Sequence, residues 1–227
     1  MIDGSVNPYL EKLKNQKIII FGNDGLSVAE LYPFNSELIP KIDEISRNLT
    51  DWRNKSMRYF FTGFKATPER TMAWLKSSVL QSNSKILYLI YVNKKTVGHF
   101  GLANVSQTRA ELDNAIRGEK GGHPDLFKYI EYVLLDIAFN HLRVQKVEGK
   151  LFSNNLLAMM LHKQFGFIVS DRSKLKRVED GEEWHYTSCE EAESNTNFDQ
   201  LIITLTKDKF LKSTENKQVK WDFDQLK

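Results

Sequence analysis

The chain has 227 residues, of which 41% are hydrophobic and 27% are charged, and its formal net charge at pH 7 is +3. A chain of this length can bury one hydrophobic core without disulfides or metal, and a second domain is not required. Because 32 basic residues are interleaved with 29 acidic ones, we expect no nucleic-acid partner.

The cysteine count and the apolar runs indicate the cellular environment. Cys189 is the single cysteine, so no intrachain disulfide can form and a reducing compartment is favoured. Asp3 and Glu11 precede the first apolar run, residues 18–21, and this start does not match a secretory signal. The longest strongly apolar run, residues 86–92, is far too short to cross a bilayer. We therefore expect a cytoplasmic protein with no membrane partner.

The first part of the chain alternates short strands with helices, after a polar leader at residues 1–16. The turn sequence Asn23-Asp24-Gly25 predicts a hairpin. Thr67 followed by Pro68 is a start signal for a helix. The elements expected here are strands at 17–21 and 26–32, a helix that is capped by Ser36 and runs through Ile45, and a helix at 68–80.

The middle of the chain predicts an antiparallel meander, because β-branched and aromatic runs are separated by short polar turns. A polar, glycine-rich loop at 117–124 follows, and apolar residues then recur at helical spacing. Asn155 and Gly166 cap and end a further helix. The elements expected are strands at 86–92, 96–105 and 110–116, a helix at 126–140, a strand at 144–152, a helix at 156–165, and strands at 167–178, 184–187 and 201–206.

This order predicts an α/β (α+β) fold in which helices flank a mixed, mostly antiparallel central sheet. The strand–helix–strand unit at 110–151 makes one pair of strands parallel. We expect a single domain at 17–211, and the polar segment 212–227 is expected to be a frayed tail.

The glycine-rich loop is a candidate anion site. Free N–H groups at the start of the helix point at a ligand, and the helix dipole favours negative charge. Arg117 and Lys120 add positive charge, so a pyrophosphate suits the loop. A plain structural turn is the alternative. The glycines at 118, 121 and 122 match neither the P-loop nor the dinucleotide-binding fingerprint.

The stretch 110–167 resembles the core of the GNAT N-acetyltransferases. That family has a strand, a loop of the form R/Q-x-x-G-x-G/A, a long helix, a strand, and a helix that begins with Asn and ends L-Y-x-x-x-G-F. Here the last part runs from Asn155 to Gly166-Phe167, and His162 stands at the position of the Tyr. Residues 52–54 and 67–74 resemble the branch that includes ribosomal-protein acetylases and acetylases of nucleotide-linked amino sugars.

The resemblance implies acetyl-coenzyme A as the acyl donor. Strand 111–116 would pair with the pantetheine arm, loop amides between 118 and 126 would hold the pyrophosphate, and Asn155 would contact the cofactor from the second helix of this core. The loop departs from the family form, because Pro124 has no N–H and Asp125 puts a negative charge near a phosphate. The cofactor-binding residues expected are Asn114, Ala115, Ile116, Arg117, Gly118, Lys120, Gly121, Gly122, His123 and Asn155.

Transfer of an acetyl group to an alkyl amine requires the amine to lose a proton, because its pKa is about 10.4 for lysine. Glu111 is the candidate base, since several GNAT enzymes carry one there, and Asp113 lies on the same face of the strand. An exposed Glu at a strand edge is the alternative. His162 is the candidate proton donor for the leaving thiol, and a surface His on a helix is the alternative.

Trp52, Arg53 and Asn54 are candidates for an acceptor pocket, in which Arg53 would meet a phosphate or carboxylate. The alternative is a helix end that Trp52 packs. His185, on a late strand, is a further candidate for the acceptor side. The five histidines are scattered without paired-ligand spacing, so no metal is expected.

By resemblance, the function expected is acetylation of the amine of a nucleotide-linked amino sugar for surface polysaccharide biosynthesis. Acetylation of a protein N-terminus, a ribosomal protein or a polyamine is the second reading. A non-catalytic coenzyme-A-binding protein is the third, because the phosphate loop is altered. The sequence leaves open whether the protein forms a homodimer.

Overall fold

The computed structural model describes residues 7–22, 24–216 and 219–224, and within them the strands form one 11-stranded sheet. Its order is β11-β1-β2-β4-β5-β6-β7-β10-β8-β9-β3. The strands are β1 (Ile18–Phe21), β2 (Ser27–Pro33), β3 (Thr62–Gly63), β4 (Ile86–Val92), β5 (Lys95–Ala103), β6 (Arg109–Arg117), β7 (Lys146–Phe152), β8 (Ile168–Asp180), β9 (Glu183–Cys189), β10 (Asp199–Thr206) and β11 (Lys220–Phe223).

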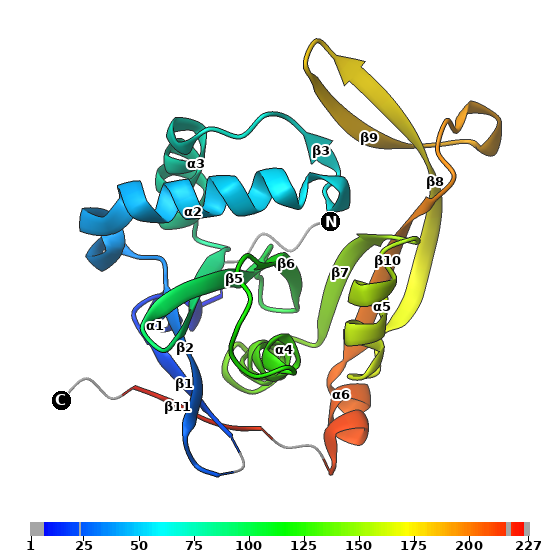
Figure 1. Cartoon of the computed structure of the whole chain (residues 1–227). Coiled ribbons are helices and arrows are strands. Elements are labelled where there is room, and N and C mark those ends of the chain that lie inside the picture. Colours follow the sequence, from blue (N-terminus) through cyan, green and yellow to red (C-terminus); the bar gives the residue numbers. More distant parts are fainter. Residues whose placement is uncertain (1–6, 23, 217–218, 225–227) are drawn as a thin grey trace.

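Helices cover both faces of the sheet (Figure 1). One hydrophobic cluster joins α2 and α3 to one face, and a larger one joins α1 and α4 to the other. The mixed, mostly antiparallel sheet with flanking helices is therefore confirmed. The helices are α1 (Leu10–Leu13), η1 (Ser36–Lys41), α2 (Ile42–Lys55), η2 (Met57–Tyr59), α3 (Pro68–Trp74), η3 (Leu75–Leu80), α4 (Leu126–Asp136), η4 (Ile137–His141), α5 (Leu156–Lys163), η5 (Glu191–Glu193) and α6 (Lys207–Thr214).

Local signals place most of these elements. Thr67 caps α3 by accepting from the amide of Arg70, and the side chain of Asn155 accepts from Ala158 at the start of α5. The helix predicted from Ser36 begins differently: Asn35 is the cap, and a 3-10 turn that contains Pro40 precedes α2. The predicted turn at 23–25 includes Asn23, which lies outside the described residues.

The β6–β7 pair is parallel, as predicted, but short. The two strands pair only over Arg109–Glu111 and Lys146–Glu148. Beyond Glu111, β6 stays paired with β5 while β7 stays paired with β10, so the sheet opens between them. At Asn114 the backbone has a φ of 55° and the β5–β6 register shifts, which bends β6 further at the opening.

Both ends of the described chain belong to the fold, contrary to the polar leader and frayed tail expected from composition. Leu10 and Leu13 of α1 are buried in the larger cluster. At the other end, α6 buries Phe210, and β11 pairs antiparallel with β1. Backbone pairing at a sheet edge needs no apolar sequence, so polar composition did not reveal β11.

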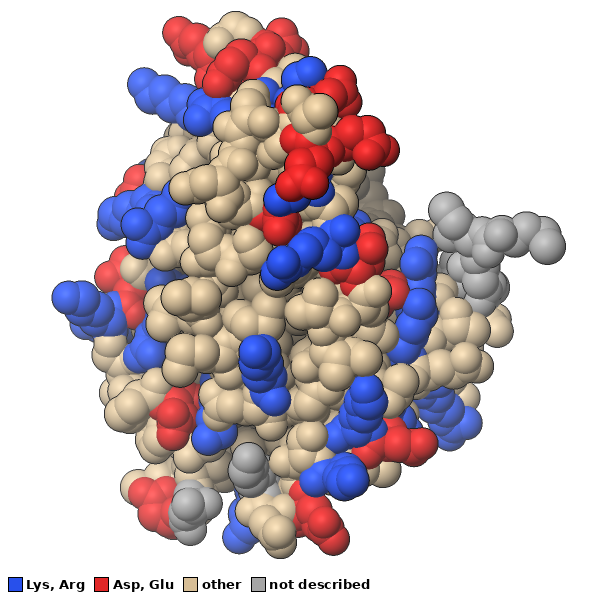
Figure 2. All heavy atoms as spheres, turned by 90° about the vertical axis from the view of Figure 1, so that its right-hand side faces the viewer, with Lys and Arg blue, Asp and Glu red and all other residues tan. Residues whose placement is uncertain are grey.

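The surface carries both signs of charge. Figure 2, which shows the right-hand side of Figure 1, has basic and acidic side chains interspersed over much of this face, and acidic ones gather at its upper end. No described helix combines the length and the apolar character needed to span a membrane.

Candidate active site

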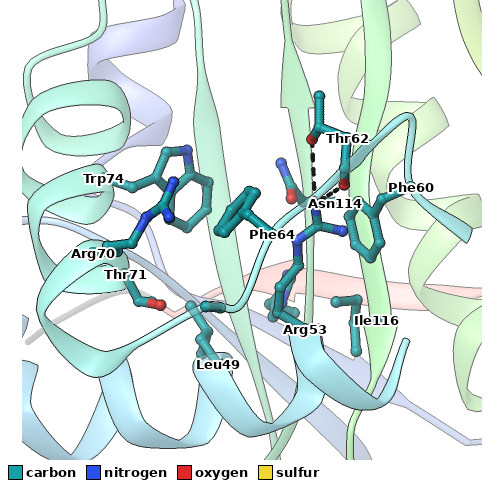
Figure 3. A pocket seen from close by; sticks show the side chains of 12 residues that line it. Leu49, Arg53, Phe60, Thr62, Phe64, Arg70, Thr71, Trp74, Asn114 and Ile116 are labelled. Carbon is teal, nitrogen blue, oxygen red and sulfur yellow. Dashed lines mark hydrogen bonds between the residues drawn. The ribbon is translucent and has the colours of Figure 1, made fainter. Parts of the chain in front are cut away.

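A cavity of about 400 Å³ lies between α2, α3 and the middle of the sheet (Figure 3). Its walls come from four parts of the chain: helix α2, the segment that contains β3, helix α3, and strands β5 and β6. It reaches β6 at Asn114 and Ile116, in the part of the strand that has left β7. The lining residues are Leu49, Arg53, Phe60, Thr62, Phe64, Ala66, Arg70, Thr71, Trp74, His99, Asn114 and Ile116.

Arg53 is the half-buried cation of this cavity. Its Nη2 donates to the carbonyl oxygen of Thr62 at 2.7 Å, and its guanidinium carbon lies 3.3 Å from the centroid of the Phe60 ring. Nη1 is buried and has no hydrogen-bond partner within the described residues. Burial lowers the pKa of Arg53 to about 10, so the group stays charged at neutral pH. A buried charged donor without a partner favours an anionic ligand.

His99, on β5, is the second polar group of the cavity with an unused atom. Its side chain is buried and stacks on Trp52, with 6.2 Å between ring centroids. Burial lowers the pKa of His99 to about 4, against the opposing effect of a hydrogen bond to the Asn114 backbone. Its Nδ1 is buried without a partner within the described part of the chain. The neutral ring therefore keeps a ring nitrogen for a ligand.

Arg70 lies at the opposite wall and is already paired. Its Nη1 is 2.7 Å from Oε1 of Glu183, and its guanidinium carbon is 4.2 Å from the centroid of the Phe64 ring. The side chains of Arg70 and Glu183 are about half exposed. Arg70 therefore forms the rim of the cavity, and Arg53 forms its interior cation.

The opening between β6 and β7 fits the expected cofactor. Residues 112–117 of β6 have one backbone edge without a neighbouring strand within the described chain, which is the edge that an extended amide-bearing arm requires. In the loop that follows, Gly121 and Gly122 have φ of 117° and 74°. The amides of Gly121, Gly122 and His123 make no hydrogen bond to any described residue. Such consecutive amides can hold a phosphate.

Gly118 and Arg117, both expected to bind the cofactor, form hydrogen bonds with the protein backbone instead. The amides of Gly118 and Glu119 both donate to the carbonyl oxygen of Val97, at 2.9 Å, so they are not available to an anion. Arg117 donates from Nη2 to the carbonyl oxygen of Gly121 at 2.7 Å, which holds the loop in its turn. Lys120 is exposed, so its charge is available at the loop surface.

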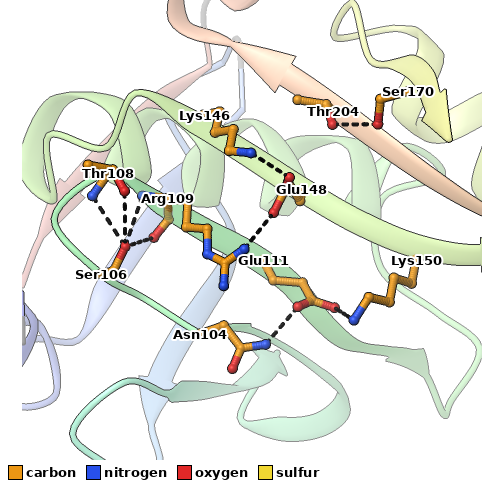
Figure 4. A network of polar contacts seen from close by, with 10 residues as sticks. All are labelled: Asn104, Ser106, Thr108, Arg109, Glu111, Lys146, Glu148, Lys150, Ser170 and Thr204. Atoms are coloured by element: carbon orange, nitrogen blue, oxygen red, sulfur yellow. Dashed lines mark hydrogen bonds and ion pairs between the residues drawn. The ribbon is translucent and has the colours of Figure 1, made fainter. Parts of the chain in front are cut away.

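Glu111 belongs to a polar network on β6 and β7 (Figure 4). Its Oε2 accepts from Asn104 Nδ2 at 2.7 Å, and its Oε1 lies 3.6 Å from Lys150 Nζ. Asp113, expected to act beside it, pairs instead with Lys85 at 3.2 Å. Each carboxylate thus has its own cation. Glu111 does not line the cavity, although it lies three residues before Asn114 on the same strand.

His162 lies on the other face of the sheet, where α5 packs against α4. Its Nδ1 is 2.7 Å from Oε1 of Glu131, a fully buried carboxylate of α4. Periodicity did not identify Glu131, because a helix pattern does not reveal which neighbour covers a polar position. Asn155 is the cap of α5, and its side chain acts within that turn.

Three of the four acceptor candidates lie outside the cavity lining. Trp52 is buried, and its Nε1 donates to Glu119 at 2.9 Å, which ties α2 to the loop. Asn54 exchanges two hydrogen bonds with the backbone of Ala66 and shapes the wall from behind. His185 is exposed on β9 and pairs with β3. Of these candidates, only Arg53 contributes a side chain to the cavity.

Most lining residues carried no sequence signal. Residues 59–64 are rich in aromatic side chains, which by itself does not distinguish a cavity wall from core packing, and the spacing of His99 suggested no role. Within the described residues, no group of three or more His, Cys, Asp or Glu side chains is arranged to hold a metal ion.

A family model described as the acetyltransferase (GNAT) domain matches residues 46–188. Solved structures share the fold. N-acetyltransferase PseH of Campylobacter jejuni, in complex with acetyl coenzyme A, is 18% identical, with 79% of this chain and 99% of that chain covered and a TM-score of 0.51. Spermidine N-acetyltransferase of Vibrio cholerae, in complex with CoA and spermine, is 17% identical, with 81% and 98% covered and a TM-score of 0.59. A GCN5-related N-acetyltransferase of Brucella melitensis is 14% identical, with 87% and 82% covered and a TM-score of 0.63. A search of curated proteins finds no match.

Proposed function

The chain belongs to the GNAT acetyltransferase family and is an acetyl-CoA-dependent N-acetyltransferase, and we propose that its acceptor is a small amine that also carries a negative charge. The observation that supports this acceptor is Arg53 Nη1, a buried guanidinium donor in the cavity wall without a partner among the described residues. The cavity-lining residues include two arginines and no carboxylate. A nucleotide-linked amino sugar supplies both the amine and the diphosphate that such a wall would bind.

The second reading includes a polyamine acceptor, and the charge of the cavity wall disfavours that acceptor. A polycation would lie against the guanidinium of Arg53, and like charges in a half-buried site repel each other. The Vibrio cholerae relative, a spermidine N-acetyltransferase, is 17% identical, and that similarity supports the fold alone. A role in surface polysaccharide biosynthesis stays a prediction that depends on the anionic acceptor. Whether the protein forms a homodimer also stays open, and sedimentation analysis would test it.

In the proposed reaction, residues from both faces of the sheet take part. Bound acetyl-CoA supplies an acetyl thioester. The free edge of β6 and the amides of Gly121 to His123 would hold and orient it in the opening between β6 and β7. The cavity on the α2–α3 face would present the amine at Asn114 and Ile116, and Arg53 would bind the acceptor's negative charge. We propose that Glu111 receives the amine proton through water and that His162 protonates the leaving sulfur.

Thiol release in the presence of acetyl-CoA tests the proposal. Purified protein is assayed with amino-sugar nucleotides, the same sugars without the nucleotide, polyamines and peptides. We expect saturable release with an amino-sugar nucleotide and at least about tenfold lower kcat/KM without its phosphates, since a charge-assisted bond contributes ~1.5–3 kcal/mol. Faster release with spermidine than with every anionic amine would overturn the acceptor class. Binding of acetyl-CoA is measured separately by calorimetry.

A further inference from the structure

Glu131 is a carboxylate in the core of the protein. It lies in α4 with none of its side chain exposed, between Ile130 and Tyr132, which are also buried. Its Oε2 is buried and has no hydrogen-bond partner among the described residues, and its Oε1 contacts His162 Nδ1 at 2.7 Å. Burying a carboxylate is costly unless a partner compensates, so an apolar residue would be expected here on stability alone.

The His162 ring is held from several sides. Glu131 occupies Nδ1, and the Phe167 ring lies 5.4 Å away between centroids. The side chain keeps 12% of its surface exposed, and Nε2 makes no hydrogen bond to any described residue. A carboxylate that accepts from Nδ1–H fixes the tautomer and leaves Nε2 as the nitrogen that exchanges protons.

We propose that Glu131 is the positioning residue of His162, an inference that rests on the proposed role of His162 as proton donor. Glu131 accepts the Nδ1–H hydrogen bond, orients the ring and stabilises the imidazolium. As the C–N bond to the acceptor forms, the thioester C–S bond breaks and its electron pair remains on sulfur. The Nε2 proton of imidazolium His162 passes to that sulfur. His162 is left neutral, with its Nδ1–H still bound to Glu131.

The placement of the pair fits this role. Ala158, Met159 and Leu161 of α5 pack on the cluster that contains α4, so His162 and Glu131 lie on the α4 face of the sheet. The acceptor cavity lies on the α2–α3 face. In this arrangement the amine and the leaving sulfur approach the opening between β6 and β7 from opposite faces of the sheet. Glu111 then receives the amine proton on one face, and His162 gives a proton to the sulfur on the other.

A double-mutant cycle tests the proposal. Four proteins are compared with wild type: Glu131→Gln, Glu131→Asp, His162→Phe, and Glu131→Gln combined with His162→Phe. We expect Glu131→Gln to lower kcat about 10–100-fold, within the range of acid–base effects, while Kd for acetyl-CoA changes less than about twofold. Glu131→Asp keeps the charge and should restore part of kcat. In the His162→Phe background, Glu131→Gln should change kcat less than about twofold.

The outcomes separate the two claims. If His162→Phe leaves kcat unchanged, both the proton-donor role and its positioning by Glu131 are overturned. If His162→Phe lowers kcat but Glu131→Gln does not, only the positioning role is overturned. A Glu131→Gln effect that persists in the His162→Phe background would show a purely structural role.

A spectroscopic readout makes the test independent of the acceptor and of turnover. In ¹H–¹⁵N spectra of ¹⁵N-histidine-labelled protein, neutral His162 should carry its proton on Nδ1 in wild type and in Glu131→Asp. In Glu131→Gln the amide can donate to Nδ1 as well as accept from it, so part of the proton should shift toward Nε2. Neutral wild-type His162 with its proton on Nε2 contradicts the proposal, and unfolding midpoints identify any variant that fails to fold.

Discussion

Trp52 of α2 donates from Nε1 to Glu119 at 2.9 Å, and this bond joins the helix that forms one wall of the cavity to the loop that precedes α4. The indole also lies directly over Gly118, where an added Cβ would come within 2.0 Å of the ring. Trp52 thus holds α2 at a fixed distance from the loop at residues 118–119, because neither the ring nor the backbone below it has room to move.

Gly118→Ala should disturb this junction. The new methyl group would overlap the Trp52 ring, so we expect a loss of about 1–3 kcal/mol in the free energy of unfolding and weaker acetyl-CoA binding, as the loop moves. Denaturant unfolding and calorimetry measure the two effects. Gly149→Ala is the control, because its nearest neighbour is the Ile203 side chain at 3.2 Å, a much smaller overlap than the 2.0 Å at Gly118. Equal stability of both variants would refute the packing argument.

Arg53 should determine acceptor affinity. Replacing it with Gln removes the buried donor, and we expect KM for the anionic acceptor to rise about 10–100-fold, while the Kd for acetyl-CoA is retained. Arg53→Lys should recover only part of the affinity, because an ammonium lacks the planar fork. Arg58→Gln, an exposed arginine that contacts Tyr59, is the control and should behave as wild type. A matching rise in KM for Arg58→Gln would point to general electrostatics.

His99 should make stability depend on pH. Its folded pKa of about 4 lies below the ordinary value of 6.5, so the unfolded chain binds the proton first. The stability is therefore complete above pH 6.5, and it is lost as the pH falls from 6.5 to 4, by on the order of 3 kcal/mol. Urea unfolding at pH 7 and pH 4.5 should show a larger decrease for wild type than for His99→Phe. Parallel decreases would mean that other groups govern the acid transition.

Glu111→Gln tests the base. If Glu111 removes the amine proton, turnover should fall about 10²-fold while acetyl-CoA affinity is preserved. Gln retains the contact to Asn104 but loses the ion pair with Lys150, so thermal unfolding should be recorded beside the rates. Equal losses in turnover and cofactor affinity would assign Glu111 to holding β6 and β7 together.

Strand β11 should contribute to stability. Trp221 donates to Asp136 Oδ2 at 3.0 Å and contacts the His141 ring, with 5.4 Å between centroids. Trp221→Ala should cost about 1–3 kcal/mol of unfolding free energy. Lys220→Ala, an exposed neighbour on the same strand, is the control. An unchanged melting temperature for Trp221→Ala would mean that β11 adds little.

Local signals in the sequence determined the order of elements and the position of the glycine-rich loop that precedes α4. The Thr67-Pro68 start, the Asn155 cap and the Gly166 stop act through hydrogen bonds and backbone angles within a few residues, so they can be recognised in the chain alone. The parallel strand–helix–strand unit follows from the same order of elements, because a helix between neighbouring strands allows parallel pairing.

The tertiary structure alone decided how the site is assembled. Arg53 faces a cavity and Asn54 binds the backbone of Ala66, and this difference depends on what packs over each side of α2. The burial of His99 and Glu131 depends on helices that are distant in sequence. Likewise, β11 forms because β1 leaves an edge free. These are long-range contacts, set by the packing of the whole core, and no periodicity within a single segment encodes them.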